Sequence, residues 1–217
     1  MTDLASARTH MIDGQLRPSE VNDERIIAAI DGVAREQFVP KAKRAVAYVD
    51  EDLEIGEGRF LMEPMVFSRL ITAAEIGEGD VVLDIGCATG YSSAVIAGLA
   101  DAVVALEQDE KLAGQAEKKL ANADVMNVAV VHGTLRDGVA KQGPFDVIVL
   151  EGMVEEIPEA LIDQLKEDGR LVCVKLEGGV GRAHIVTMHD GIAGGRNLFD
   201  ANVQPLPGFK LDKGFVF

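Results

Sequence analysis

The residues best suited to chemistry lie between Val81 and Tyr91, where an acid and two glycines follow a short apolar run. Residues 81–85 predict a buried strand, residues 86–90 a tight turn, and residues 91–99 a helix with apolar side chains on one face. Glycines let a ligand approach the backbone closely, and free N–H groups at the start of a helix point into the gap. The arrangement predicts a pocket for a nucleotide-like ligand.

Two acids near this turn indicate which ligand. Asp84 stands just before the glycines, and Glu107 follows a second apolar strand predicted at residues 102–106. An acid about 20 residues past a glycine turn accepts hydrogen bonds from both ribose hydroxyls. The spacing is not the G-x-G-x-x-G of a dinucleotide site, and Asp84 would repel a phosphate. S-adenosylmethionine carries a sulfonium, an ammonium and a ribose but no phosphate, so the pattern favours a methyltransferase over a dehydrogenase. An ordinary strand–turn–helix with an incidental Asp84 is the alternative.

Composition narrows the class of protein. The chain has 217 residues, 47% of them hydrophobic, which suits one domain with an appendage. The net charge of −15 argues against binding to nucleic acid and to anionic membrane surfaces, because both partners need clustered Lys and Arg.

The histidines and cysteines indicate neither a metal site nor a disulfide. The four histidines show no ligand spacing, so no metal site is expected. Cys87 and Cys173 are expected to be buried free thiols in a reducing cytoplasm. The first residues resemble no signal peptide and no apolar run is long enough to cross a bilayer, so a cytoplasmic location is expected.

Strands and helices alternate over most of the chain. Residues 1–48 are expected to be helical, with Asn22 or Asp23 as a cap, and residues 49–64 irregular. Further helices are expected at residues 65–74, 109–121 and 158–166. Strands are predicted at residues 81–85, 102–106, 127–131, 145–150, 170–175, 183–189 and 198–203. This order predicts an α/β fold with a seven-stranded, mostly parallel sheet, helices on both faces and ligands at the carboxyl ends of the strands.

Further motifs, from the opening helices to residue 171, point to one family. They are residues 11–17 (MIDGQLR), 33–39 (VAREQFV), 47–58, 81–91, 132–133, 144–146 and 156–171. With these motifs the chain resembles the protein-L-isoaspartate O-methyltransferase family over nearly its whole length. The resemblance implies a Rossmann-like class I methyltransferase fold, made of a helical and acceptor-loop segment at 1–64 and a cofactor-binding domain at 65–217 that form one structural unit.

The resemblance also implies an activity. The methyl group of S-adenosylmethionine would pass to the side carboxylate of an isoaspartyl residue in a damaged protein or peptide, which would leave S-adenosylhomocysteine. A carboxylate is already a nucleophile at neutral pH, so no strong base is required. The catalytic residues stay unassigned. The residues expected at the cofactor are Asp84, Gly86, Cys87, Ala88, Thr89, Gly90, Tyr91, Glu107, Gln108, Gly133, Thr134, Leu135 and Glu151.

The acceptor loop departs from the family pattern. Where the family carries Gln-Thr-Ile-Ser, this chain has Arg59, Phe60, Leu61 and Met62, so two hydroxyl donors are missing. We expect Arg59 to grip the acceptor carboxylate in their place with two hydrogen bonds. The alternative is a surface arginine paired with Glu57 or Glu63.

Three other positions depart or stand out. The third motif has Gly133-Thr134-Leu135 where the family has Gly-Asp-Gly, and so lacks an acid for the adenine amino group. Ala88 replaces the middle glycine of the loop and is expected to keep a negative φ. Glu151 suits an amine or hydroxyl acceptor better than a carboxylate, because like charges repel.

Three functions stay open: an isoaspartyl methyltransferase, a methyltransferase of this fold acting on a small molecule or a protein amine or hydroxyl, and a non-catalytic S-adenosylmethionine-binding protein. A monomer or a homodimer fits the sequence equally well. The apolar end, residues 209–217, is expected to pack on its own chain as a final strand, with a partner chain as the alternative.

Overall fold

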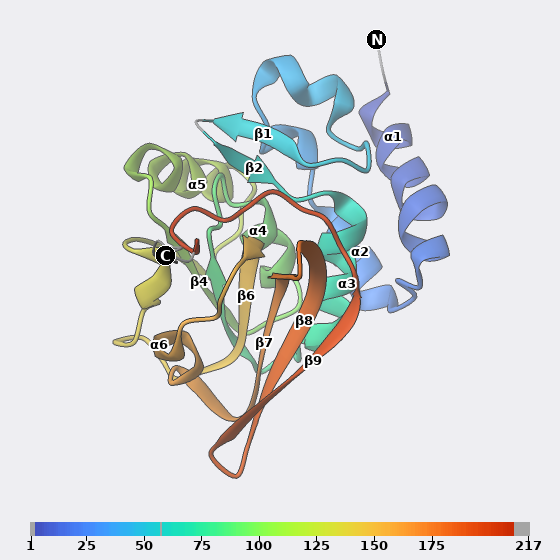
Figure 1. Cartoon of the computed structure of the whole chain (residues 1–217). Coiled ribbons are helices and arrows are strands. Elements are labelled where there is room, and N and C mark those ends of the chain that lie inside the picture. The colour runs from blue at the N-terminus through green and yellow to red at the C-terminus, as the bar shows by residue number, and fades with distance from the viewer. Residues whose placement is uncertain (1–2, 57, 211–217) are drawn as a thin grey trace, which may run out of the picture.

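The seven-stranded sheet forms the centre of the molecule in a computed structural model, which describes residues 3–56 and 58–210 (Figure 1). The strand order is β5-β4-β3-β6-β7-β8-β9, and the first four pairings are parallel. The parallel strands are β3 (Val81–Ile85), β4 (Ala102–Glu107), β5 (Val128–His132), β6 (Phe145–Val154) and β7 (Leu165–Glu177). The strands β8 (Val180–His189) and β9 (Ile192–Asp200) continue the sheet as antiparallel hairpins. The predicted mostly parallel sheet is therefore confirmed.

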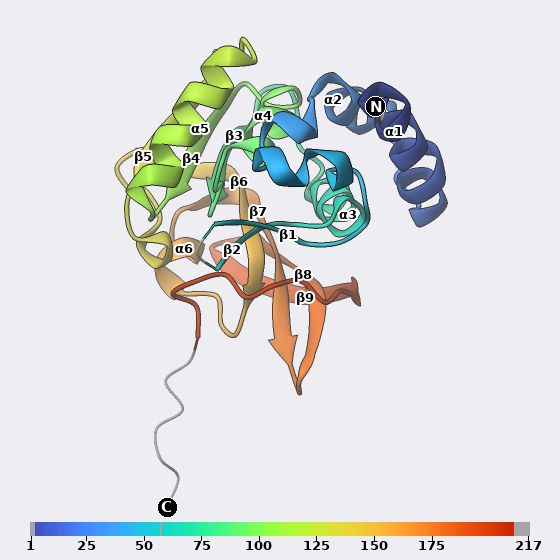
Figure 2. The same cartoon turned by 90° about the horizontal axis from the view of Figure 1, so that it is seen from above.

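Helices cover the two faces of this sheet unequally. Among the described elements, one face packs against three helices: α3 (Pro64–Ala74), α4 (Tyr91–Ala97) and α5 (Glu110–Asn122). The helix α2 (Glu24–Gly32) packs on α3 and α4, and α1 (Leu4–Met11) joins the same hydrophobic core. The other face packs against the short helix α6 (Glu159–Ile162), the 3₁₀ turn Leu135–Asp137 and the segment 206–209. Seen from above, α4 and α5 lie on the opposite side of the sheet from α6 (Figure 2). Helices on both faces are thus confirmed, with most of the helical mass on one.

Local signals in the sequence start several of these helices. Asp23 caps α2, as predicted, because its carboxylate accepts the Arg25 N–H at 2.8 Å. Pro64 opens α3, where its missing N–H costs nothing. Asp109 caps α5 by accepting the N–H groups of Lys111 and Leu112. The N-terminal segment is largely helical, as expected. A π turn at Ile12–Leu16 and a 3₁₀ turn at Arg17–Ser19 extend α1, and 3₁₀ turns at Arg35–Gln37 and Lys41–Val46 follow α2.

Three sequence predictions need correction. Residues 49–64 are not wholly irregular, because β1 (Leu53–Gly56) and β2 (Arg59–Leu61) pair as an antiparallel hairpin with a bulge. The helix expected at 158–166 is only α6, because Leu165 already pairs with Phe145 as the start of β7. The last strand runs over β9, not over 198–203. An Asp190-Gly191 turn with both φ values positive closes the β8–β9 hairpin, and Asp-Gly is a strong hairpin signal that the sequence analysis passed over.

The N-terminal helices and the sheet share one hydrophobic core, in which Met11, Leu16 and Ile30 join Val82 and Val147. The division into segments 1–64 and 65–217 stays a prediction. The buried side chain of Phe209 packs on the second face, whereas residues 211–217 of the predicted final strand lie outside the described residues. Among the described helices, none has the length and apolarity needed to span a membrane.

Candidate functional site

The glycine loop lies at the carboxyl ends of β3 and β4, where the sequence placed it. The Gly86 and Cys87 N–H groups both donate to the Leu106 carbonyl, so the last residues of β4 shape the loop. Gly86 and Gly90 have φ of 83° and 91°, which favours glycine. The expected negative φ of Ala88 is wrong, because its φ is 52°. A hydrogen bond of 2.8 Å from the Ala88 N–H to Glu107 Oε2 holds that left-handed conformation.

Asp84 is fully buried in β3 and has one carboxylate oxygen in use. Its Oδ2 accepts the hydroxyls of Ser92 and Ser93 at 2.7 and 2.5 Å, and its Oδ1 has no hydrogen-bond partner among the described residues. Burial raises the pKa of Asp84 to about 6, while the two serine hydroxyls work in the opposite direction. The sequence analysis missed both serines, although hydroxyls in the first helical turn after a glycine loop were visible there. The free Oδ1 leaves Asp84 able to accept one more donor.

Glu107 ends β4, is fully buried and already accepts four hydrogen bonds. Its Oε1 accepts the N–H groups of Gln108 and Asp109 at 2.9 and 3.0 Å and Arg59 Nη1 at 2.7 Å. Its Oε2 accepts the Ala88 N–H. Three of the four donors are main-chain groups of the loop and of the strand end. Glu107 therefore helps to build the loop, and its predicted role as the ribose-binding acid stays a prediction.

Arg59 lies inside the protein beside this loop. It is 4% exposed, and besides its ion pair with Glu107 it donates from Nη2 to the Gly86 carbonyl at 2.9 Å. The alternative of a surface arginine paired with Glu57 or Glu63 is therefore wrong, because Glu107 holds the guanidinium. Its expected role at the acceptor carboxylate stays a prediction, because in this conformation both terminal nitrogens donate to other groups.

Leu206 closes the space in front of Gly86 from the other side. A Cβ atom on Gly86 would lie 2.7 Å from Leu206 Cδ1 and 3.2 Å from Arg59 Nη2. Leu206 belongs to the C-terminal segment that crosses the same end of the sheet as the β1–β2 hairpin (Figure 1). The glycine loop thus lies under two side chains of its own chain.

The remaining predicted cofactor residues lie around the loop in different environments. Cys87, Thr89 and Tyr91 are buried, and the Thr89 hydroxyl donates to the Phe38 carbonyl at 2.5 Å. Gln108 is half-buried next to Glu107, and the Gly133 N–H donates to the Glu107 carbonyl at 3.0 Å. Thr134 is exposed, and Leu135 packs in the core of the second face. The structure brings Gly133 to the loop but places the Leu135 side chain in the core.

Glu151 in β6 adds a third buried acid to the site, beside Asp84 and Glu107. Its Oε1 has no partner, and burial together with the neighbouring Asp84 holds its pKa well above the ordinary value. Nearby Arg35, which the sequence analysis did not single out, is fully buried and lies over the Tyr91 ring at 4.7 Å. Arg35 donates to the carbonyls of Ala47 and Met62, and its Nη1 has no partner. The site therefore holds unpaired buried groups of both charges.

The two other acceptor-loop candidates point to different places. Phe60 is half-buried and lines a groove of about 400 Å³ together with Pro205, Leu206 and Pro207. Met62 is 4% exposed and belongs to the core, so its side chain does not face this groove. On the far side of Arg59, a smaller groove of about 180 Å³ runs between the hairpin and α5. Arg59 and Leu206 thus each line one of the two grooves that flank the loop.

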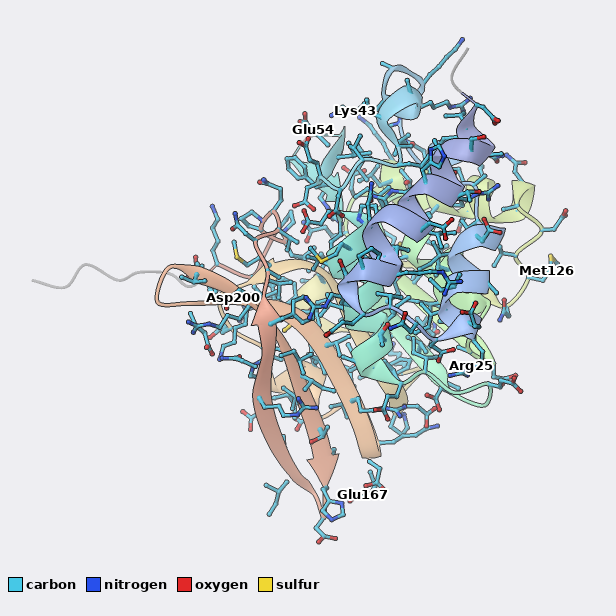
Figure 3. The ribbon with its side chains drawn as sticks, turned by 90° about the vertical axis from the view of Figure 1, so that its right-hand side faces the viewer. Arg25, Lys43, Glu54, Met126, Glu167 and Asp200 are labelled. Atoms are coloured by element: carbon cyan, nitrogen blue, oxygen red, sulfur yellow. The ribbon has the colours of Figure 1, made fainter. Side chains whose placement is uncertain are left out.

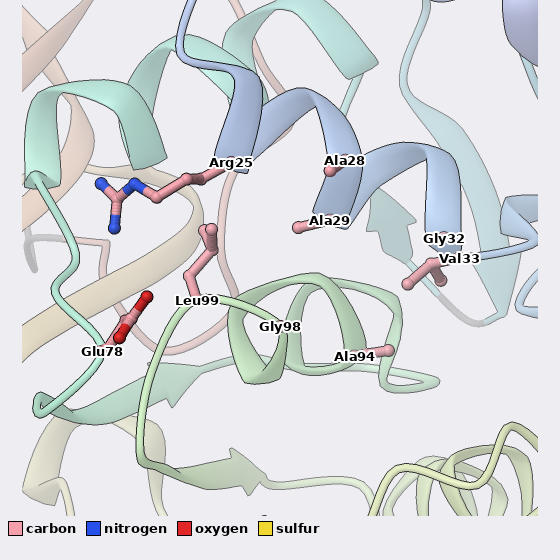
Figure 4. Close-up of a pocket in the computed structure, with 9 residues that line it drawn as sticks. All are labelled: Arg25, Ala28, Ala29, Gly32, Val33, Glu78, Ala94, Gly98 and Leu99. Atoms are coloured by element: carbon pink, nitrogen blue, oxygen red, sulfur yellow. The ribbon is translucent and has the colours of Figure 1, made fainter.

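Two other features lie away from the loop. A groove of about 450 Å³ between α2 and α4 is lined largely by small and apolar residues, with Arg25 and Glu78 at one end (Figure 4). Three exposed potential metal ligands, Glu167, Asp168 and His189, meet near the tip of the β8–β9 hairpin. Figure 3 shows Glu167 at the opposite end of the molecule from Glu54 of β1. Neither feature includes a predicted site residue among the described residues that form it.

The donors and acceptors of the loop fit S-adenosylmethionine in kind. The unpaired buried oxygens of Asp84 and Glu151 suit a ligand that carries an ammonium, and Glu107 suits a ribose. In this conformation Arg59 donates to Glu107 and to the Gly86 carbonyl, and a Cβ atom on Gly86 would clash with Leu206.

Known proteins of one family match this chain. The family model for protein-L-isoaspartate(D-aspartate) O-methyltransferase matches residues 6–184. A protein-L-isoaspartate O-methyltransferase of Koribacter versatilis is 35% identical over 208 residues, 96% of this chain and 94% of the relative. One of Methanoculleus marisnigri is 40% identical over 165 residues, 76% of this chain and 75% of the relative.

Solved structures agree with this match. A protein-L-isoaspartate O-methyltransferase structure has a TM-score of 0.81 and 26% identity, and the match covers 93% of this chain and 66% of that one. A Plasmodium falciparum structure, described as a putative member in complex with S-adenosyl-L-homocysteine, has a TM-score of 0.78 and 20% identity, covering 95% and 99%. From the matched length and the identities, the chain belongs to the protein-L-isoaspartate(D-aspartate) O-methyltransferase family.

Proposed function

We propose that the chain is an S-adenosylmethionine-dependent methyltransferase that methylates the side carboxylate of isoaspartyl residues in proteins. The observation that carries the proposal is the glycine loop between Asp84 and Glu107, in a chain that belongs to this family. The parallel pairing of β3 with β4 places both acids at the carboxyl edge of the sheet, where ligands of such folds bind. Bound S-adenosylmethionine would supply an activated methyl group at that edge.

The chain's own residues would position the reactants and exclude water. An ionised carboxylate needs no base to act as nucleophile, which suits a site where burial raises the pKa of the Cys87 thiol. Asp84 and Glu151 would hold a cationic group through their unpaired oxygens, and Glu107 would orient a ribose. The groove lined by Phe60, Pro205, Leu206 and Pro207 would receive the acceptor peptide. We further propose a monomer or homodimer that works in the cytoplasm on protein and peptide acceptors.

A different acceptor is the second candidate, and Glu151 is the observation that favours it. The buried carboxyl of Glu151 in β6, just past the residue that pairs with the end of β3, disfavours a second carboxylate but suits an amine or a hydroxyl. Phe60 and Met62, in place of the hydroxyl residues of the family, also make the acceptor side more apolar. A non-catalytic S-adenosylmethionine-binding protein is the remaining alternative.

Transfer of a labelled methyl group to an isoaspartyl peptide tests the proposal, with the ordinary aspartyl peptide as the matched control. Binding of S-adenosylhomocysteine is measured calorimetrically in the same preparation. Label in the isoaspartyl peptide alone is the expected result. Binding without transfer to either peptide would contradict the isoaspartyl acceptor, and label transferred to an amine substrate would establish the second candidate.

A further inference from the structure

The two side chains that cover Gly86 come from segments far apart in the sequence. Arg59 extends from β2, and Leu206 extends from the segment that follows β9. Asp52 joins these segments, since its Oδ1 accepts the Glu63 N–H at 2.8 Å and its Oδ2 accepts the Gln204 N–H at 2.6 Å. We name Arg59 and Leu206 together the cover. Its two members therefore belong to one connected layer over the loop.

Arg59 competes for the group that a ribose needs. Each carboxylate oxygen has about two lone-pair positions, and among the described residues Glu107 Oε1 already accepts three donors, whereas Oε2 accepts only the Ala88 N–H. Its three N–H donors are part of the loop and of the end of β4, so losing them would unfold the loop. The guanidinium is the only one of the four that can leave without changing the main chain. A ribose hydroxyl can therefore reach Glu107 Oε1 in the place where Arg59 now donates.

The two parts of the cover are held differently. The Leu206 N–H donates to the Met153 carbonyl at 2.8 Å, and the Met153 N–H donates to the Gln204 carbonyl at 2.9 Å. The backbone at Gln204 and Leu206 is therefore bonded to the carboxyl end of β6. The β1–β2 hairpin has four and three residues in its strands and a bulge at Glu54–Gly56. A short two-stranded hairpin is marginally stable by itself. Movement of the hairpin would withdraw Arg59, whereas Leu206 would leave by rotation of its side chain.

We propose that Arg59 is a built-in competitor of the cofactor: S-adenosylmethionine binds only when the guanidinium releases Glu107 and Leu206 turns away from Gly86. The inference rests on the proposed function, because it takes the cofactor from there. It adds that this chain binds its cofactor more weakly than the glycine loop alone would allow. Glutamine, the residue that the family resemblance gives at this position, has no charge to pair with Glu107.

Calorimetric titration with S-adenosylhomocysteine tests the competition on the full chain. Arg59→Gln removes the charge, Arg59→Lys keeps it, and Leu206→Ala opens the space over Gly86 without altering any charge. Arg170→Gln is the control, since it breaks an ion pair with Asp80 of the same 2.7 Å length elsewhere in the protein. Circular dichroism and the melting temperature report whether each variant is folded.

The expected result is a Kd about tenfold lower, or more, for Arg59→Gln, because a hydrogen bond to a charged group contributes about that factor. Arg59→Lys should stay close to wild type, Leu206→Ala should bind several-fold more tightly, and Arg170→Gln should not change. The competition is overturned if wild type binds S-adenosylhomocysteine and the Arg59→Gln and Leu206→Ala variants bind it with equal or weaker affinity. That result would leave the proposed function intact. If wild type and all variants are folded and none of them binds S-adenosylhomocysteine, both the competition and the proposed function are overturned. If Arg59→Gln does not fold, Leu206→Ala alone decides.

Discussion

The glycine loop and its cover are built from different kinds of contact. Main-chain hydrogen bonds from Gly86 and Cys87 to Leu106, and the pairing of β3 with β4, hold the loop. In the cover, the Arg59 side chain makes the contacts to the loop, through its ion pair with Glu107 and its bond to the Gly86 carbonyl, whereas the Leu206 main chain bonds to Met153 of β6. By the family resemblance, the loop keeps both acids and two of its glycines and departs at Ala88, whereas Arg59 of the cover replaces a glutamine. Sequence change is tolerated more easily where a side chain, not the backbone, makes the contact.

Removing the charge of Glu107 should have the largest effect, because Glu107 joins the two regions. Glu107→Gln leaves the buried Arg59 without a counter-charge, and breaking a buried pair costs about 3–5 kcal/mol of unfolding free energy. Glu24→Gln is the matched control, since its pair with Arg17 has the same 2.7 Å length on the surface and contributes about 0–1 kcal/mol. Urea unfolding measures both. Equal losses in the two variants would mean that Glu107 does not hold the loop and cover together.

The pH dependence of the unfolding free energy should show the effect of the buried Asp84 beside the glycine loop. The folded-state pKa of Asp84 is about 6, above its ordinary value of 3.8, so the folded protein binds the extra proton. The contribution of this protonation to the unfolding free energy is fully present below about pH 4 and is lost as the pH rises through about 6. From pH 4 to 7, the unfolding free energy of wild type should therefore fall by about 1–3 kcal/mol more than that of Asp84→Asn. The exposed Asp200→Asn is the control, and parallel curves for wild type and Asp84→Asn would refute the effect.

Restoring a hydroxyl on the cover side should have the smallest effect on stability. Phe60 is half-buried in the groove, so Phe60→Thr should change the unfolding free energy by less than about 1 kcal/mol. One added hydrogen bond to the acceptor should raise kcat/KM for an isoaspartyl peptide about two- to tenfold. Phe60→Val, which has nearly the shape of threonine but no hydroxyl, is the control. Identical kcat/KM values for the two variants would exclude this position from acceptor recognition.

Much of the fold was predictable because its signals are local. The apolar run at residues 81–85, the glycines after it and the acid at Glu107 predicted two parallel strands with a loop between them, as the structure shows. The hairpin β1–β2 was missed because its strands are short and a bulge breaks their alternation. Ala88 was assigned the wrong sign of φ, since a hydrogen bond from another strand end holds it in the left-handed region.

What the sequence determined by itself is the family, the order of strands and helices, and the acids and glycines of the loop. These depend on residue type and on spacing along the chain. Only the tertiary structure decided that Arg59 pairs with Glu107, 48 positions away, and that Leu206 lies over Gly86. Such contacts depend on how the hairpin and the C-terminal segment cross the end of the sheet, and no local pattern encodes that crossing.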